Sequence, residues 1–395
     1  MTRRVTDGGV TDGEHSRSDP DSVAVVGAGA VGVIAAHDLA ARGVAVTLFE
    51  RGQVASGASG RAAGIVYDAF AEDRDAAVAA RALSRFRAFA ADGVGSFTPC
   101  PYLWFAREGD DRSAAAIREQ VPRMREHGRD VALLDPDEVR ERFRALEVPV
   151  EIAAVAHDAG YLDPGSYVEA LAEWAGSAGV DVRADTAAAI DEWDDGSVTL
   201  DTGDGTESFD AVLVAAGAHT KRVLADAGVP IAMKPYRVQA LVTRSIDVDV
   251  PMTYDATEGY YFRPREGGLL VGDGTERREA DPDEWNPEGD EWFVADSRER
   301  LRSGLGVDPD VRRAWAGLCT ATPDRDPLLG PVDDTESLFV ATGFQGHGFM
   351  RSPALGEAAA EWLLGGDVGA VAGFDPRRFD GDEAFEVFEG MTLAE

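Results

Sequence analysis

The apolar pattern of the chain begins at residue 22 with two hydrophobic runs that flank a helical pattern. The first run covers residues 23–26, the helical pattern covers residues 30–42, and the second run ends at Glu50. Gly43 follows the helical pattern directly, at a position where helices commonly end. Short apolar runs bounded by turn signals indicate buried strands, and 3.6-residue periodicity indicates a helix. This stretch therefore predicts a strand–helix–strand unit of a parallel sheet.

Later segments repeat both patterns. Helical spacing predicts helices over residues 74–91 and 165–178, a charged helical region over residues 110–144, and a last helix that begins after Pro353. Apolar runs predict strands at residues 102–106, 211–216, 239–243, 260–263, 269–272 and 338–342. The pattern predicts an α/β (α+β) fold, in which a Rossmann-type domain of discontinuous segments carries an inserted antiparallel β-sheet domain.

Gly27, Gly29 and Gly32 form a G-x-G-x-x-G motif between the first predicted strand and its helix. In this context the motif indicates a dinucleotide site. The first glycine permits a tight turn, the second lets the backbone approach a pyrophosphate, and the third allows close helix–strand packing. Glu50 ends the second strand, where an acid can accept hydrogen bonds from a ribose. We assign to the same site Ala28, Ala30, Val31 and Arg51.

Two further clusters of small residues favour FAD over NAD, because FAD extends from adenine to isoalloxazine across much of a domain. The first cluster spans residues 56–65, and the second spans residues 343–348, some 280 residues later. A helix starting near Ser352 would direct its positive end at the reduced ring. The remaining residues assigned to FAD are Ser56, Ala58, Ser59, Arg61, Ala62, Ala63, Gly64, Ile65, Ala188, Ala216, Gly217, Gly317, Gly343, Gly346, His347, Gly348, Phe349 and Met350.

The expected FAD-binding domain comprises residues 21–98, 150–234 and 315–375. The expected substrate domain comprises residues 99–149 and 235–314. We expect a disordered tail over residues 1–20 and an acidic C-terminal tail over residues 376–395.

The charge balance is strongly acidic: Asp and Glu number 72 against 38 Lys and Arg, a formal net charge of −34. Acidic residues are spread along the chain, which indicates a solvated surface suited to high salt. Nucleic acid is excluded as a partner, since phosphate contacts need clustered positive charge. The two cysteines form no metal-binding C-x-x-C pair, and no metal is expected. No apolar run is long enough to span a membrane, and the predicted location is the cytoplasm.

Several motifs in the same order resemble the amine-oxidising flavoproteins of the D-amino-acid oxidase, glycine oxidase and sarcosine oxidase family. They are Gly27–Gly32 with Glu50, Ser56–Ile65, Gly160–Pro164, Ala215–Ala218, Tyr260–Pro264 with Gly272, Trp315–Gly330 and Gly343–Phe349. The segment GHGF followed by SPALGEA is most similar to the branch of sarcosine oxidase, dimethylglycine dehydrogenase and the proline dehydrogenase β-subunit. The resemblance implies that a small, N-substituted amino acid transfers hydride to flavin N5, and that water hydrolyses the resulting imine.

The chain departs from the family at three positions. Some relatives attach flavin through a cysteine at the position of Gly317, so noncovalent FAD is expected here. Cys319 stands where glycine-oxidase-like members carry a carboxylate-binding arginine, and Met350 stands where sarcosine-oxidase-like members carry a lysine. Because that lysine serves the substrate and oxygen activation, its loss favours a dehydrogenase over an oxidase.

Three residues are candidates for contact with the substrate. Tyr261 stands where relatives place a tyrosine that faces the substrate carboxylate, Arg263 follows on the same strand, and Arg351 could supply the charge that Met350 lacks. Plain packing roles remain the alternative for each of them. The rival functions are a 2-hydroxy acid dehydrogenase and a flavin subunit of a larger dehydrogenase complex. The electron acceptor (oxygen, a quinone or an electron-transfer flavoprotein), any partner subunit or homo-oligomer, and the substrate itself stay open.

Overall fold

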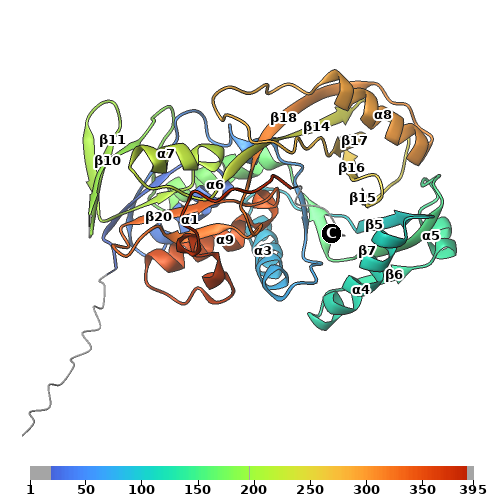
Figure 1. Ribbon diagram of the computed structural model, residues 1–395, viewed down its shortest axis with the longest axis horizontal. Helices are drawn as coiled ribbons and strands as arrows, with labels where there is room; N and C mark the ends of the chain where they lie inside the picture. The colour runs from blue at the N-terminus through green and yellow to red at the C-terminus, as the bar shows by residue number, and fades with distance from the viewer. Residues whose placement is uncertain (1–18, 195, 389–395) are drawn as a thin grey trace, which may run out of the picture.

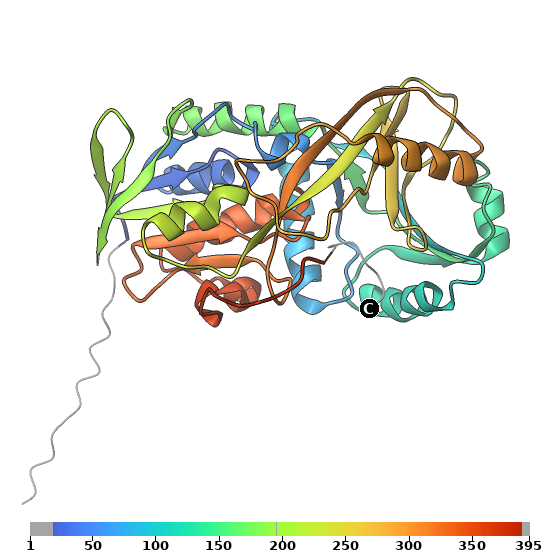
Figure 2. The same ribbon diagram turned by 45° about the horizontal axis from the view of Figure 1, so that its top comes forward.

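A computed structural model describes residues 19–194 and 196–388. Most of the tail expected over residues 1–20, and the last seven residues of the expected C-terminal tail, lie outside the described residues. The described chain forms two large sheets side by side (Figure 1). The hairpin of β10 and β11 and the helices α4 and α5 lie at opposite ends of the molecule, as the turned view also shows (Figure 2).

The first sheet has six strands in the order β19-β20-β13-β1-β2-β9. All neighbours pair in parallel except β19, which runs antiparallel to β20. Its strands are β1 (Ser22–Val26), β2 (Ala45–Phe49), β9 (Asp181–Arg183), β13 (Ala211–Val214), β19 (Leu328–Pro331) and β20 (Leu338–Thr342). Because β1, β13 and β20 are apolar on both faces, the sheet needs a cover on each side.

One face of this sheet packs against α1 (Ala30–Ala40), α6 (Pro164–Ser177), α9 (Gly348–Leu363) and α3 (Asp73–Ala91), which share a large core with Val23 and Val25. The other face, with Ala24 and Val26, is covered by α7 (Thr220–Asp226) and a three-stranded sheet. The strands of that small sheet are β10 (Ala189–Asp194), β11 (Ser197–Asp201) and β12 (Thr206–Phe209). The alternation along β1 thus divides the core into two clusters.

The second large sheet has eight strands in the order β18-β14-β17-β16-β15-β5-β7-β6. Its pairs are antiparallel except that of β5 with β15. The strands are β5 (Tyr102–Arg107), β6 (Val131–Leu134), β7 (Val150–Ala156), β14 (Lys234–Thr243), β15 (Met252–Asp255), β16 (Tyr260–Arg265), β17 (Gly268–Gly272) and β18 (Val311–Ala321). Helices α4 (Asp111–Glu126), α5 (Pro136–Arg142) and α8 (Glu291–Leu305) pack on this sheet.

A third, small sheet of β3 (Ile65–Tyr67), β8 (Ala159–Tyr161) and β4 (Thr98–Pro99) lies where the two parts meet. The short helix α2 (Ala58–Arg61) precedes β3. Single 3-10 turns follow β13 (η1, Gly217–His219) and α9 (η2, Gly369–Phe374; η3, Pro376–Arg378). The chain passes between the two large sheets several times, so each is assembled from separated segments.

Sheet membership refines the expected organisation. The predicted domain boundary at residue 150 is the first residue of β7, and the boundary at 315 lies within β18; both strands belong to the eight-stranded sheet. The charged helical region expected over residues 110–144 consists of two helices, α4 and α5, which β6 separates. Within residues 376–388, Val387 is buried against Tyr236, so this part of the expected tail packs on the protein.

The last helix begins at Gly348, five residues before Pro353, after which it was predicted to start. A proline inside a helix has no N–H to donate to the carbonyl four residues earlier. Here the Ser352 hydroxyl donates to the Phe349 carbonyl at 2.8 Å and supplies the missing hydrogen bond. The positive end of α9 therefore lies at His347, within the third glycine cluster.

Candidate active site

The turn between β1 and α1 is formed by the three glycines predicted to do so. Gly27 has φ +112°, and a Cβ there would lie 2.5 Å from the Ala215 carbonyl oxygen. A Cβ on Gly32 would lie 2.1 Å from the Gly27 oxygen. Gly29 differs, since its added Cβ would meet only the Ser59 hydroxyl, at 3.1 Å. Two glycines thus serve internal packing, and the third leaves the backbone open to a ligand.

The N-terminus of α1 suits an anion. The helix carries no side-chain cap at Gly29 and no acidic residue in its first turn. The Ser59 hydroxyl accepts from the Ala30 N–H at 3.0 Å, which places the second small-residue cluster beside the helix end. Free N–H groups and the helix dipole favour phosphate at such a terminus. Ala28 and Val31 belong to the same turn and are buried.

Glu50 lies at the end of β2, beside the glycine turn. Its carboxylate accepts from the Ala28 N–H at 3.0 Å and from the Gly52 N–H at 2.9 Å. Arg51 is exposed and lies 3.4 Å from Asp283. Ala216 lies against Gly27, because an added Cβ on Gly27 would come within 3.0 Å of its Cα. Ala188 and Ala216 both pack against the core on the other face of the sheet.

Strand β18 brings the two other glycine clusters together. On one side, the Trp315 indole donates to the Arg61 carbonyl at 3.0 Å, and an added Cβ on Gly317 would lie 3.4 Å from Arg61 Cβ. On the other, the Thr320 hydroxyl accepts from the Gly343 N–H at 3.1 Å and from the Phe344 N–H at 3.2 Å. Residues some 280 positions apart therefore meet along six residues of one strand.

The backbone within these clusters is shaped for close approach. Gly64, Gly217, Gly343 and Gly346 all have positive φ, as does Gln345 at 49°. Arg61 folds back to donate to the Gly57 carbonyl at 3.0 Å. The turn, the free helix end and the three converging clusters together fit an extended dinucleotide such as FAD. Gly317 offers no nucleophile for a covalent bond, and burial raises the pKa of the nearby Cys319 thiol to about 12.

Tyr261 and Arg263 lie on one face of β16, because alternate residues of a strand point the same way. Tyr261 is in register with Tyr254 on β15, which is in register with Trp104 on β5. A Cβ added to Gly272 would lie 2.3 Å from the Tyr261 hydroxyl oxygen, so the tyrosine side chain lies across this glycine. The glycine on β17 thus makes room for the tyrosine.

Arg263 is buried and connects the eight-stranded sheet with the second glycine cluster. Its Nε donates to the Ala63 carbonyl at 2.6 Å, and Nη1 donates to the Pro264 carbonyl at 2.9 Å. Its guanidinium carbon lies 4.6 Å from the ring centroid of Tyr161. Burial lowers its pKa to about 10, so it remains charged at neutral pH. These contacts make Arg263 a support of the loop that contains Ala62 and Ala63.

The first turn of α9 contributes polar groups. His347 and Arg351 are buried, and neither His347 Nε2 nor Arg351 Nε has a hydrogen-bond partner among the residues that the structure describes. Burial lowers the pKa of His347 to about 3, so its ring is neutral. Phe349 points elsewhere: its ring centroid lies 5.7 Å from those of Phe86 and Tyr167. Met350 is buried in the same core.

Aromatic side chains that the sequence did not single out complete this region. The ring of Tyr67 stacks on Phe70 at 5.1 Å and on Tyr102 at 4.4 Å between centroids. Phe70 in turn contacts His347 at 5.9 Å and the Arg351 guanidinium at 4.8 Å. This aromatic wall, defined as Tyr67, Phe70 and Tyr102, joins β3 to β5. The one available signal was that Tyr67 lies two residues beyond the small-residue cluster at residues 56–65.

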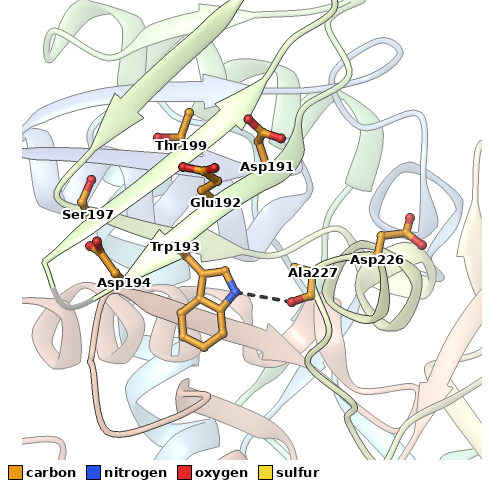
Figure 3. A pocket seen from close by; sticks show the side chains of 8 residues that line it. All are labelled: Asp191, Glu192, Trp193, Asp194, Ser197, Thr199, Asp226 and Ala227. Atoms are coloured by element: carbon orange, nitrogen blue, oxygen red, sulfur yellow. Dashed lines mark hydrogen bonds between the residues drawn. The ribbon is translucent and has the colours of Figure 1, made fainter.

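A separate hollow of about 490 Å³ lies on the β10–β11 hairpin, where the Trp193 indole donates to the Ala227 carbonyl at 3.4 Å (Figure 3). Acidic side chains surround it, and it contains none of the predicted site residues. Among the described residues, no group of His, Cys, Asp or Glu is arranged to hold a metal ion. None of the described helices is long and apolar enough to cross a membrane.

The glycine turn, the parallel sheet and the second sheet that faces it define a flavin-dependent oxidoreductase. The chain belongs to the DAO family of FAD-dependent oxidoreductases, whose family profile matches residues 22–362. Similar solved structures include L-proline dehydrogenase from P. horikoshii, with a TM-score of 0.83 and 25% identity over 92% of this chain and 98% of the other. Glycine oxidase from Geobacillus kaustophilus, at 24% identity and a TM-score of 0.83, shares the fold.

Two curated relatives differ in extent. The 4-methylaminobutanoate oxidase (formaldehyde-forming) of Paenarthrobacter nicotinovorans is 30% identical over 91% of this chain, but the chain spans only 46% of that protein. Monomeric sarcosine oxidase of a Bacillus species (strain B-0618) is 27% identical over 87% of this chain and 92% of its own length. These similarities confirm three predictions from the sequence: the family, the fold and FAD as the cofactor.

Proposed function

We propose that this protein oxidises the C–N bond of a small, N-substituted amino acid with noncovalent FAD. The observation that carries the proposal is the arrangement along β18, which forms hydrogen bonds with Arg61 and with the turn at residues 343–345, while the aromatic wall contacts His347 just beyond that turn. The named relatives act on sarcosine, 4-methylaminobutanoate, glycine and proline, which are all small amino acids. Their common chemistry supports an amine substrate over a 2-hydroxy acid.

The residues of the chain divide the work in the proposed mechanism. When bound, FAD accepts a hydride equivalent from the substrate carbon next to nitrogen. The glycine turn and the N-terminus of α1 would hold the pyrophosphate, and Glu50 the ribose. The positive end of α9 would stabilise negative charge on the reduced ring. Arg351 would hold the substrate carboxylate, with Tyr261 facing it, while the buried aromatic wall excludes water.

The neutral ring of His347 is suited to accepting a hydrogen bond, not to acting as a strong base. The imidazole forms a hydrogen bond with the backbone of Gln345, and its Nε2 has no partner among the described residues. When the other ring nitrogen carries the proton, Nε2 is an acceptor. This arrangement suits a substrate amine that enters uncharged, as the mechanism without a strong protein base requires.

The electron acceptor is proposed to be something other than oxygen. Met350 is apolar and buried, so it adds no positive charge next to the flavin position. A flavin subunit of a larger complex remains the second candidate, because the chain spans less than half of the 4-methylaminobutanoate oxidase. The distributed acidic residues support adaptation to high salt, and stability that fails to rise in molar KCl would contradict that adaptation. The proposed location is the cytoplasm, since the two cysteines form no disulfide framework.

The decisive experiment is anaerobic reduction of the purified FAD-loaded protein, followed at the flavin absorption band. Sarcosine, dimethylglycine, L-proline, D-alanine and glycine are compared with L-2-hydroxyglutarate. Bleaching by an amine supports the proposal, and the rate of recovery in air distinguishes an oxidase from a dehydrogenase. Bleaching by the hydroxy acid alone would replace the proposed amine oxidation with 2-hydroxy acid oxidation. A yellow protein that no compound bleaches would favour the partner-dependent flavin subunit.

A further inference from the structure

Arg351 is held on one edge only. It lies in the first turn of α9 and is 6% exposed. Its Nη1 lies 2.8 Å from Asp75 Oδ1, at the start of α3. Its guanidinium carbon lies 4.8 Å from the centroid of Phe70. Its Nε is buried and has no hydrogen-bond partner in the described part of the chain. The ion pair engages Nη1 and leaves Nε unused.

An unused edge of a buried guanidinium indicates a missing acceptor. Leaving a buried donor unpaired costs about 1–3 kcal/mol, and more when the group is charged. A guanidinium presents its N–H groups in a rigid fork that matches a carboxylate with two parallel hydrogen bonds. Since Asp75 engages Nη1, Nε is the donor that remains for a second carboxylate.

The surroundings of Arg351 are those of the aromatic wall. Phe70, which lies against the guanidinium, also contacts His347 and Tyr67. The unpartnered Nε2 of His347 belongs to the same turn of α9. An acceptor for an amine N–H, His347 Nε2, and a donor to a carboxylate, Arg351 Nε, thus belong to residues that both contact Phe70.

We propose that Asp75 is a positioning residue that holds Arg351 with its Nε edge free to bind the carboxylate of the substrate. This inference rests on the proposed function and adds to it the residue that would position Arg351 for the carboxylate of the amino acid. An N-methyl amine without a carboxylate would lack the contact with Arg351. Asp75 itself does not touch the substrate.

Asp73 provides a matched control for Asp75. Both lie in the first turn of α3 and carry the same charge near the same helix end. The side chain of Asp73 is 97% exposed and contacts His127 at 3.5 Å, whereas Asp75 contacts Arg351. Asp73→Asn and Asp75→Asn therefore change charge and helix dipole alike, and differ in the contact with Arg351.

The test measures ligand affinity and flavin reduction separately in the FAD-loaded protein. Binding of acetate is followed by perturbation of the oxidised flavin spectrum, and rapid-mixing reduction gives a dissociation constant and a limiting rate for the best amino acid of the panel. We expect Asp75→Asn to weaken both carboxylates by about tenfold or more, the scale of one charge-assisted hydrogen bond. The limiting rate should change much less. Asp73→Asn should match the wild type, and Asp75→Glu should recover part of the affinity.

Arg351→Lys keeps the charge beside Asp75 but removes the Nε donor, so it should weaken carboxylate binding as Asp75→Asn does. This variant tests the inference independently if Asp75→Asn folds poorly. Equal losses in the two Asp→Asn variants, or wild-type affinity in Arg351→Lys, would overturn the inference. The inference would also be overturned if Arg351→Lys changed the spectrum of the ligand-free flavin and left the affinity for acetate unchanged. That result would assign Arg351 to the flavin. Acetate binding needs no turnover, so a wild-type protein that no amine reduces would refute the proposed function without deciding the role of Asp75.

Discussion

The nucleotide end and the substrate end of this site are built by different means. The nucleotide end, Gly27 to Glu50, is one short stretch in which backbone groups form the binding surface. The substrate end combines side chains from α3, β3, β5, β16 and α9 with Phe70 from the loop after β3, and Phe70 contacts Arg351 directly. A backbone site depends on which residues lack a side chain. A side-chain site depends on strand register and helix packing over long separations.

The largest expected effect is at the nucleotide end. Gly32→Val places a Cβ 2.1 Å from the Gly27 carbonyl oxygen, a backbone atom that cannot rotate away. We expect a loss of about 3 kcal/mol in unfolding free energy, the upper part of the range for overpacking, and loss of bound FAD. Gly57→Ala is the control, since a Cβ there meets nothing within 4 Å. The ratio of flavin to protein measures the FAD content, and the Tm measures the stability. Normal FAD content in Gly32→Val would refute the assignment of this turn to FAD binding.

Removal of the Glu50 charge should have the next largest effect. The carboxylate accepts from two backbone N–H groups, and a carboxamide can offer only one of its two atoms as an acceptor. Hydrogen bonds to charged groups contribute about 1.5–3 kcal/mol, so Glu50→Gln should weaken FAD binding by at least about tenfold. Fluorescence titration of the apoprotein with FAD measures this loss. Unchanged affinity would show that Glu50 supports the turn without reaching the cofactor.

The contrast between the two ends also explains what the sequence could predict. The predicted strand–helix–strand unit matches β1, α1 and β2 closely, because glycine turns and apolar periodicity are local signals. The start of α9 was missed because the Ser352 hydroxyl, through a local hydrogen bond that the apolar pattern does not indicate, replaces the N–H that Pro353 lacks. The aromatic wall could not be predicted, because Tyr67 and Tyr102 meet only when β3 packs against the eight-stranded sheet. Asp75 gave no signal, since acidic residues are common in the first turn of a helix.

The neutral His347 makes a prediction about pH. Its pKa is lowered to about 3 by burial, whereas the unfolded chain has the ordinary value near 6.5. Between these values the unfolded state binds more protons, so stability rises with pH and is lost as pH falls below about 6.5. His347→Asn should reduce the slope of unfolding free energy by up to about 1.4 kcal/mol per pH unit between pH 4 and 6. Urea unfolding should show a constant difference between the two proteins above pH 7; an unchanged acid slope would contradict the buried neutral ring.

Arg263 tests whether the two ends are separable. Its Nε donates to the Ala63 carbonyl, so a side chain of the eight-stranded sheet supports the loop that faces the flavin position. Arg263→Lys keeps a cation but loses the fork and the flat contact with Tyr161. We expect FAD affinity to fall about fivefold, the equivalent of about 1 kcal/mol, with a smaller change in substrate affinity. If the substrate dissociation constant rises while FAD affinity stays unchanged, Arg263 anchors the substrate directly, and the sheet contributes a second cation to the carboxylate site. A loss in FAD affinity alone would mean that the backbone site, too, depends on long-range register at its flavin end.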